Sequence, residues 1–371
     1  MIISHIGSRG IPAVYSGVEN AIEELSKRLV EQGIDITVYC HSKKIKTSYY
    51  SFTKLIELPT IHTKHLATIV HSLISTIHVI FTDTDIVHYH GIGSSIFSFI
   101  PRIFGKKTIV TVHALDWKRK KWNKLVQFLL KLCEISALYF PNKTIVVSKH
   151  LKNYFKNKYN KETYFIPNGV NIQKGLQDTP SEDYILFVGR LVPEKGIQYL
   201  IRAFNDINTD KELWIAGQAS YTDWYFRELK KISQKNIRFL GPIYGEKLSA
   251  LYNNAYIFVL PSEIEGCPIA LLEAMSHKKC CLISNIPECV EIGSDCTMTF
   301  ENKDHADLKK KLELLLNDPQ LVYDLGKKAW GKIKIDYDWG NIVLTLKNIY
   351  LSLDEISLSK DIIRPMTNQN K

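Results

Sequence analysis

Several patterns that mark cofactor- and nucleic-acid-binding proteins are missing from this sequence of 371 residues. The seven cysteines form no C-x-x-C pair and include the adjacent Cys280 and Cys281, so we expect buried, reduced thiols and no zinc site. No zinc-finger, RNP or KH pattern is present, which argues against a nucleic-acid partner. No G-x-G-x-x-G follows the first predicted strand, so a nicotinamide cofactor is poorly supported.

A secretory signal and a membrane-spanning run are also missing. The N-terminus has no basic region ahead of a long apolar stretch, and the most apolar run, from Leu66 to Phe81, contains His71 and His78 and is too short to span a bilayer. We therefore expect a cytoplasmic protein, with that run as a helix packed on a sheet. A chain with 45% hydrophobic and 23% charged residues is globular, and its length favours two domains.

Positive charge is concentrated in one part of the chain. The formal net charge is +10, and residues 101–161 contain 15 Lys and Arg against the two acids Asp116 and Glu134. A one-sided field of this kind favours an anionic partner, such as lipid head groups or a diphosphate-linked acceptor. A solvated basic helix face is the alternative.

Short apolar runs alternate with helical patterns along the whole chain, which predicts two parallel, doubly wound α/β sheets. The first series of strands opens with a loop that runs from Gly7 to Gly17 and leads into a helix. The second series begins near Ile185, after a polar linker. The predicted strands are 2–6, 34–39, 85–89, 108–112 and 144–147, then 185–188, 213–216, 237–240, 257–260 and 280–284.

Five charged or titratable residues stand where a predicted strand ends or the next helix begins, which is where ligands bind in such sheets. Arg190 and Lys195 flank one strand-loop-helix turn, so two cations and a helix dipole can converge on one anion. Glu265 lies in a loop and Glu273 follows it by eight positions, inside a helix. His113 ends another strand. The four charged residues could instead be solvated surface residues, and a lone histidine such as His113 is more often structural.

Glycines in two of these loops let a ligand approach the backbone. Gly17, at the end of the opening loop, precedes a helix N-terminus that can present N–H groups to a phosphate, and Gly266 follows Glu265. Asp83 and Asp85 form a D-x-D, but they precede a strand, and we interpret them as a turn with a strand-capping acid.

Four stretches together resemble the family 4 retaining glycosyltransferases, which have the GT-B fold. They are the opening loop GSRGIPAVYSG, VHALDWKRKKW with His113, GRLVPEKG with Arg190 and Lys195, and E-x7-E from Glu265 to Glu273. The resemblance covers nearly the whole chain and is greatest to a bacterial subgroup that builds capsule or O-antigen, including rhamnosyltransferase-like members. Ser16 and the S-H-K-K-C-C run after Met275 depart from the family's usual glycines.

The resemblance implies roles for the candidate residues. Arg190 and Lys195 would bind the donor diphosphate, and Glu273 the nucleotide ribose. Glu265 would hold the transferred sugar, with Gly266 beside it, and His113 would bond a sugar hydroxyl. The family implies no metal and no separate cofactor, since a nucleotide-diphosphate sugar such as a UDP- or dTDP-sugar is the donor substrate. It implies a glycan or polyprenyl-diphosphate-linked acceptor.

The resemblance also implies two Rossmann-like domains facing a central cleft. We expect an N-terminal acceptor-side domain over residues 1–168, a linker over 169–183 and a nucleotide-sugar domain over 184–335. A helix over 336–358 would cross back, and 359–371 would be a polar tail. The alternatives that stay open are a non-catalytic nucleotide-sugar-binding protein and another GT-B enzyme, such as a nucleotide-sugar epimerase or a phosphorylase.

The segment 117–132 combines lysines with Trp117, Trp122 and apolar residues at helical spacing. Such a helix can lie in a membrane interface, with its cations near acidic head groups. An ordinary packed helix with a basic outer face is the alternative. Together with the lipid-linked acceptors of the family, the pattern predicts reversible binding to an anionic membrane, on the inner face of the cell membrane.

Overall fold

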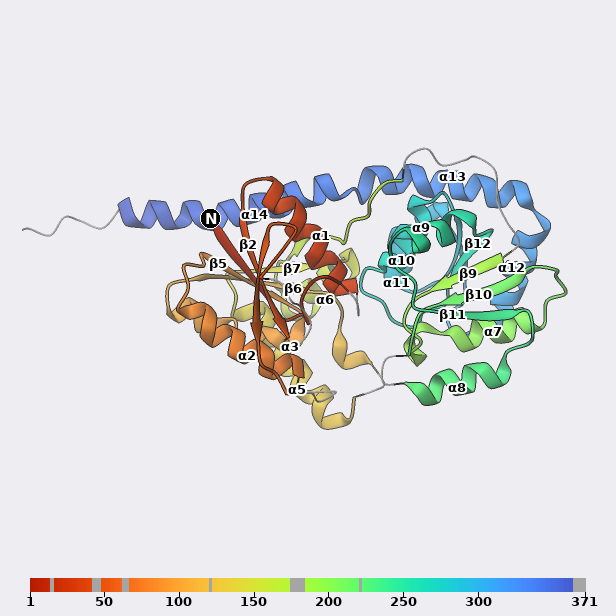
Figure 1. Ribbon diagram of the computed structural model, residues 1–371, viewed down its shortest axis with the longest axis horizontal. Helices are drawn as coiled ribbons and strands as arrows, with labels where there is room; N and C mark the ends of the chain where they lie inside the picture. The colour runs from red at the N-terminus through yellow and green to blue at the C-terminus, as the bar shows by residue number, and fades with distance from the viewer. Residues whose placement is uncertain are drawn as a thin grey trace, which may run out of the picture. The chain divides into compact units, whose positions relative to one another are not determined.

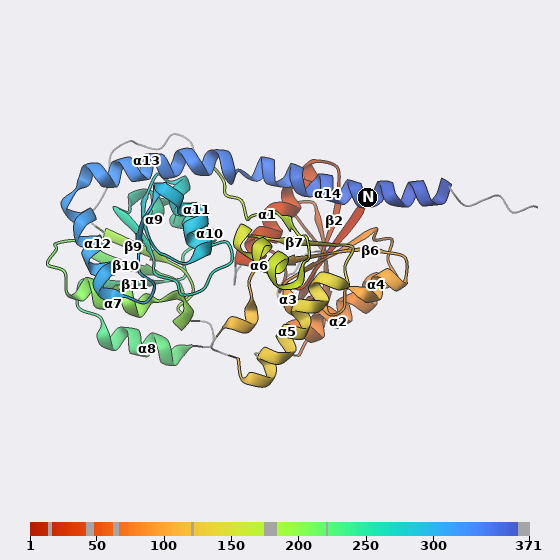
Figure 2. The same ribbon diagram turned by 180° about the vertical axis from the view of Figure 1, so that it is seen from behind.

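The computed structural model describes residues 1–13, 17–41, 48–61, 67–119, 122–173, 184–219 and 222–362. They form two compact units (Figures 1 and 2). The first consists of residues 1–112, 129–145 and the chain from 340 onward, and the second of residues 113–128 and 146–339. The prediction places all of residues 1–168 in one domain. The structure assigns 113–128 and 146–168 to the second unit, because loops such as the one at His113 pack against it.

An eight-stranded sheet has the order β3-β4-β2-β1-β5-β6-β7-β8. The pairs β1–β2, β1–β5, β2–β4 and β5–β6 are parallel, and β3 pairs antiparallel with β4 in a hairpin that the sequence analysis misses. Since β1 and β5 are neighbours, the direction of winding reverses between them. The strands are β1 Ile2–Ile6, β2 Asp35–His41, β3 Tyr49–Tyr50, β4 Thr53–Leu58, β5 Ile86–His90, β6 Lys107–Val112, β7 Lys143–Val146 and β8 Tyr164–Phe165.

Helices cover both faces of this sheet, and alternation along β5 shows which helix faces which side. His88 points toward α14, where its Nδ1 lies 2.6 Å from the hydroxyl of Tyr350. Tyr89 points the other way, toward α2, and its hydroxyl lies 2.9 Å from Oγ1 of Thr76. The helices are α1 Gly17–Glu31 and α14 Trp339–Ile362 on the His88 side, and α2 Ala67–Ile80, α3 Ile92–Ser95, α4 Phe99–Ile103 and α5 Lys124–Tyr139 on the other.

The bounds of three helices are set by identifiable residues. The segment 92–103 is divided into α3 and α4, because Pro101 has no N–H to bond Phe97 and its ring excludes a continuous helix there. Helix α5 begins at Lys124. Its start is set by Asn123, whose side-chain oxygen accepts from the backbone N–H of Val126 at 2.9 Å.

The second unit is built on a six-stranded sheet with the order β11-β10-β9-β12-β13-β14, in which every neighbouring pair is parallel. Because β9 and β12 are adjacent, the direction of winding reverses between them, and the loops after these two strands border the crevice where such folds bind ligands. The strands are β9 Tyr184–Val188, β10 Glu212–Ala216, β11 Ile237–Gly241, β12 Ile257–Leu260, β13 Cys280–Ser284 and β14 Met298–Phe300.

The predicted second series of strands and the predicted final helix are confirmed. The helices of the second unit are α6 Lys149–Tyr159, α7 Ile197–Asn205, α8 Asp223–Ile232, α9 Gly245–Asn254, α10 Ile269–Ser276, α11 Pro287–Gly293, α12 His305–Asn317 and α13 Pro319–Asp336, with single 3-10 turns at Asp116–Lys118, Pro193–Lys195 and Ser294–Cys296. Among the described residues, no helix is both long and apolar enough to cross a membrane. Most of the expected linker, 174–183, and the tail from 363 lie outside the described residues.

Candidate active site

The loops that follow β9 and β12 are in direct contact. Gly196, at the end of the first loop, has a φ of +68°, and a Cβ there would lie 1.9 Å from the carbonyl oxygen of Pro261 in the second. Only glycine satisfies both conditions without displacing the backbone. The backbone N–H of Glu263 also donates to the carbonyl of Glu194 at 2.8 Å. The two loops are therefore joined through their main chains.

This junction brings Lys195 and Glu265 together as an ion pair. Nζ of Lys195 lies 2.5 Å from Oε1 of Glu265, and Oγ of Ser262 donates to the same oxygen at 2.6 Å. The two charged side chains are 16% and 9% exposed, so the pair is shielded from solvent and weakly screened. Both hydrogen bonds that Glu265 receives from the described residues end on Oε1.

The loop at His113 packs directly on the loop at Glu265. A Cβ on Gly266 would lie 1.7 Å from the carbonyl oxygen of His113 and 3.5 Å from Cβ of Ala114. The sequence predicts that Gly266 lets a ligand approach the backbone, whereas in the structure the atom that approaches it is the carbonyl oxygen of His113. Desolvation lowers the pKa of His113 to about 4, against the opposing charge of Asp116, so its imidazole is neutral at pH 7.

Arg190 lies among charges from both loops. Desolvation lowers the pKa of its guanidinium, and Arg119 lowers it further, while the carboxylates of Glu265 and Asp116 act in the opposite direction. Arg119 is held by Asp116, with Nε 3.2 Å from Oδ1. Arg119 was not among the residues predicted for the site. The spacing of three between Asp116 and Arg119 on one turn, directly after His113, is the signal that could have identified it.

Glu273 lies inside α10, as predicted, and its side chain is half-buried. The hydroxyl of Tyr252, from α9, donates to its Oε2 at 2.9 Å. Burial and the neighbouring carboxylate raise the pKa of Tyr252 well above its usual value, so the phenol remains a donor. This hydrogen bond orients the Glu273 carboxylate. The sequence pattern does not predict that Tyr252 is its partner.

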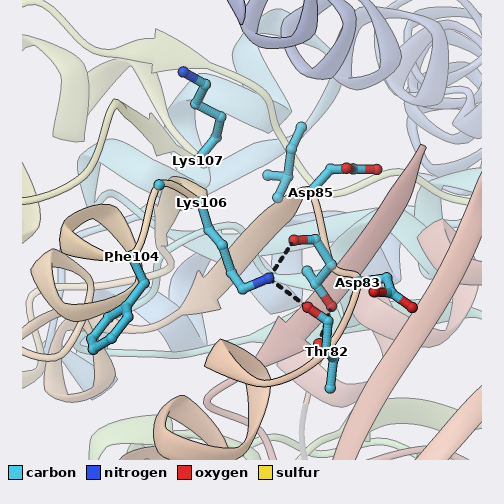
Figure 3. A pocket seen from close by; sticks show the side chains of 9 residues that line it. Thr82, Asp83, Asp85, Phe104, Lys106 and Lys107 are labelled. Atoms are coloured by element: carbon cyan, nitrogen blue, oxygen red, sulfur yellow. Dashed lines mark hydrogen bonds between the residues drawn. The ribbon is translucent and has the colours of Figure 1, made fainter.

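Gly17 belongs to the first unit, where it is the first residue of α1 and is exposed. Ser16, one of the two departures from the family pattern, lies outside the described residues. At the opposite end of the first sheet, a depression of about 440 Å³ is lined by the residues around Asp83 and Asp85 (Figure 3). Asp85 accepts from the backbone N–H of Ile2 at 2.7 Å, which is the predicted strand-capping role.

A cluster of three buried histidines lies in the first unit. His5, His88 and His90 offer ring nitrogens that lie within 4.8 Å of one another. Nδ1 of His5 lies 2.8 Å from Nε2 of His90, and both nitrogens of His88 are engaged, by the hydroxyls of Tyr350 and Thr111. Burial lowers the pKa of His5 to about 3. Because both ring nitrogens of His88 already have hydroxyl partners, we interpret the cluster as a hydrogen-bond network.

Comparison with known proteins agrees with this geometry. A family model described as Glycosyltransferase Family 4 matches residues 15–174, and one described as Glycosyl transferases group 1 matches residues 171–331. Two parallel-sheet α/β units with these matches define the GT-B class. The chain is a glycosyltransferase of the GT-B type.

Relatives are found along its whole length. The chain is 25% identical over 377 residues to UDP-Gal:alpha-D-GlcNAc-diphosphoundecaprenol alpha-1,3-galactosyltransferase of Escherichia coli, covering 91% of this chain and 94% of that one. In two other curated relatives the matched stretch spans 48% and 42% of the protein. Sucrose-phosphate synthase from Thermosynechococcus elongatus has the same fold, with a TM-score of 0.84, 19% identity and coverage of 96% and 99%. Anabaena HepE in complex with UDP and glucose also has this fold, with a TM-score of 0.79 and 14% identity, covering 95% of this chain and 100% of that one.

Proposed function

We propose that this protein is a retaining glycosyltransferase that moves a hexose or deoxyhexose from a UDP- or dTDP-sugar to a glycan or polyprenyl-diphosphate-linked acceptor, in the synthesis of a bacterial surface polysaccharide. The observation that carries the proposal is the Lys195–Glu265 pair beside Arg190, at the reversal point of the second sheet. The printed names of the relatives support the substrates: one acts on a diphosphoundecaprenol acceptor, and one binds UDP and glucose.

Lys195 and Arg190 would stabilise charge on the leaving diphosphate. The ammonium group of Lys195 has three donors and gives one to Glu265, so two remain for phosphate oxygens. The guanidinium of Arg190 is already desolvated, which strengthens its attraction for an anion. Preorganised cations of this kind act on the transition state at no reorganisation cost. Metal-independent transfer follows from this arrangement and is part of the proposal.

The carboxylates would act on the sugar and the ribose. Oε1 of Glu265 is engaged by Lys195 and Ser262, so Oε2 would accept from a sugar hydroxyl and offset positive charge at the anomeric carbon. Glu273, oriented by Tyr252, would accept from the ribose hydroxyls. His113, neutral at pH 7, can donate to or accept from a sugar hydroxyl. In a retaining transfer the leaving phosphate takes the acceptor proton, so no protein group is assigned as general base.

We also propose that the protein works at the cytoplasmic face of the membrane, where a lipid-linked acceptor is found. The basic segment 117–132 was the predicted contact, but Lys120 and Lys121 lie outside the described residues. The ring of Trp117 is covered by Lys118 and Lys158, at 5.9 and 5.7 Å from its centroid. Trp117 therefore contacts cations of the second unit, and membrane contact by this segment stays a prediction.

Transfer assays across donors test the proposal. Labelled UDP-hexoses and dTDP-rhamnose are incubated with a polyprenyl-diphosphate-linked acceptor in excess EDTA, and the anomeric configuration of the product is read by NMR. We expect transfer from one donor with retention. An epimerised free nucleotide sugar, or binding without turnover, would contradict the proposal in favour of the alternative GT-B enzyme or the binding protein. Activity that is lost in EDTA and restored by Mg²⁺ would refute metal independence alone.

A further inference from the structure

Helix α2 has the reverse of the usual amphipathic arrangement. The residues that it turns toward the sheet are mostly polar, and His71, Ser72 and Thr76 are completely buried. The residues that it exposes at i, i+4 and i+8 are Ile69, Leu73 and Ile77, which are 37%, 37% and 50% exposed. A helix on a water-facing surface normally buries the apolar stripe. The outward stripe of α2 therefore has the chemistry of a surface that contacts something apolar.

Helix α5, on the same side of the sheet, shows the same inversion. From residue 129 onward, α5 buries Cys133, Glu134, Ser136 and Ala137. On its outer side it exposes Leu129, Leu132, Ile135 and Tyr139, each between 42% and 49%.

The C-terminal ends of α4 and α2 extend this apolar surface. Ile103 at the end of α4 is 74% exposed and Phe104 is 59% exposed, while Phe81, directly after α2, is 82% exposed. Figure 3 shows Phe104 standing at the side of the depression, away from its carboxylates.

These residues share one side of the first unit. Helices α3 and α4 lie between α2 and α5. Helix α2 contacts both α3 and α4, and Oγ of Ser95 in α3 donates to the carbonyl of Cys133 in α5 at 2.8 Å. Helices that cover the same face of a sheet expose their outer stripes in the same direction, and both views place α2 and α5 together (Figures 1 and 2). We call the exposed apolar residues named above the α2–α4–α5 face.

The charges around this face indicate what covers it. The three helices contain one acidic residue, Glu134, and it is completely buried. Arg102 and Lys131, both exposed, and Lys107 supply cations at the edge. A second copy of the chain on this face would bring these cations together, whereas the exposed carboxylates Asp83 and Asp85, in the depression that Phe104 also lines, belong to the loop before β5 and not to the helices. An anionic lipid surface is complementary in both respects, since its interior is apolar and its head groups are negative.

We propose that the α2–α4–α5 face inserts into the head-group and acyl boundary of an anionic bilayer. This docking surface shares only Leu129, Lys131 and Leu132 with the segment 117–132, and the inference does not depend on which sugar is transferred. Apolar insertion makes part of the binding resistant to salt, whereas attraction by surface lysines alone is screened.

Vesicle flotation with a matched pair of variants tests the inference. Ile103→Glu places a charge on the face, and Ile335→Glu is its control, because the two isoleucines are 74% and 73% exposed and each lies near the C-terminal end of a helix. With phosphatidylcholine vesicles that contain phosphatidylglycerol, at about 0.5 M salt, we expect the wild type and Ile335→Glu to float. We expect Ile103→Glu to lose roughly tenfold in partitioning, the scale for removing one large apolar side chain.

Site-specific labelling gives a second measurement. All seven cysteines are buried, so a cysteine introduced by Ile103→Cys or Ile335→Cys can be labelled selectively with an environment-sensitive dye. Vesicles should shift the emission to the blue at residue 103 and leave residue 335 unchanged. Equal flotation of Ile103→Glu and wild type, or no flotation of the wild type, would overturn the inference. So would a lipid-free dimer that Ile103→Glu dissociates, since a second copy would then cover the face. Failure of sugar transfer with normal flotation would contradict only the proposed function.

Discussion

Gly266→Ala should separate the loop at His113 from the loop at Glu265. The new Cβ would lie 1.7 Å from the His113 carbonyl oxygen, and Cβ atoms essentially never approach another heavy atom within 3.0 Å, so one loop must move by at least 1.3 Å. The φ of Gly266 lies outside the left-handed region, so alanine can adopt its backbone conformation and the effect is purely one of contact. A displacement of about 1 Å in a group that positions substrate costs on the order of 100-fold in rate.

The assay is steady-state transfer by purified protein, together with thermal unfolding. We expect turnover of Gly266→Ala to fall roughly 100-fold, with a stability loss of about 1–3 kcal/mol from overpacking. Gly331→Ala is the control, because nothing lies within 4 Å of a Cβ there and Gly331 is inside α13. Alanine at that position should stabilise the helix by about 0.5–1 kcal/mol and leave turnover unchanged. Turnover of Gly266→Ala within threefold of wild type, in a folded protein, would refute the argument that contact between these loops positions the site.

Three further predictions concern single side chains. Arg190→Ala and Lys195→Ala should each lower turnover by roughly two to three orders of magnitude, and near-normal rates in both folded variants would exclude them as the diphosphate site. Glu273→Ala should weaken the binding of free nucleotide, measured by calorimetry, and Tyr252→Phe should weaken it less. Unchanged nucleotide affinity in Glu273→Ala would refute the assignment of Glu273 to the ribose. Folding stability should fall as pH decreases from about 6.5 to about 4, because unfolded His113 takes up a proton there and folded His113 does not. His113→Asn should reduce that pH dependence, by up to roughly 3 kcal/mol at pH 4, and an identical pH profile would count against it.

The strands other than β3, β4, β8 and β14, and the ends of strands where charged residues gather, could be predicted from the sequence. Glu265, Arg190 and Lys195 are brought together because each follows a strand at the reversal point of the second sheet. The partners that orient them could not be predicted, because Ser262, Tyr252 and Arg119 act through tertiary contacts. The role of Gly266 was assigned to a ligand because a sequence does not show which backbone lies opposite.

The apolar run from Leu66 to Phe81 predicts a helix, which α2 confirms over Ala67–Ile80, but it does not predict which face of that helix is buried. The pattern places a stripe of large apolar residues along α2, and such a stripe is normally buried. In the structure the polar residues His71, Ser72, Ser75 and Thr76 are buried, and Ile69, Leu73 and Ile77 are exposed. Periodicity predicts that two faces of a helix differ in polarity. Which face is buried depends on the side chains of the sheet against which the helix packs.

The bond between His88 and Tyr350 joins residues 262 positions apart, and it has a consequence for how the protein is made. The ribosome releases the strands of the first sheet early, but the helix that closes over His88 is translated near the end. Val343, Leu346 and Tyr350 of that helix are buried, so their partners stay exposed to solvent throughout synthesis of the second unit. The unit encoded second can therefore complete its core before the unit encoded first, and a chain that stops before residue 340 would contain one finished core and one open one.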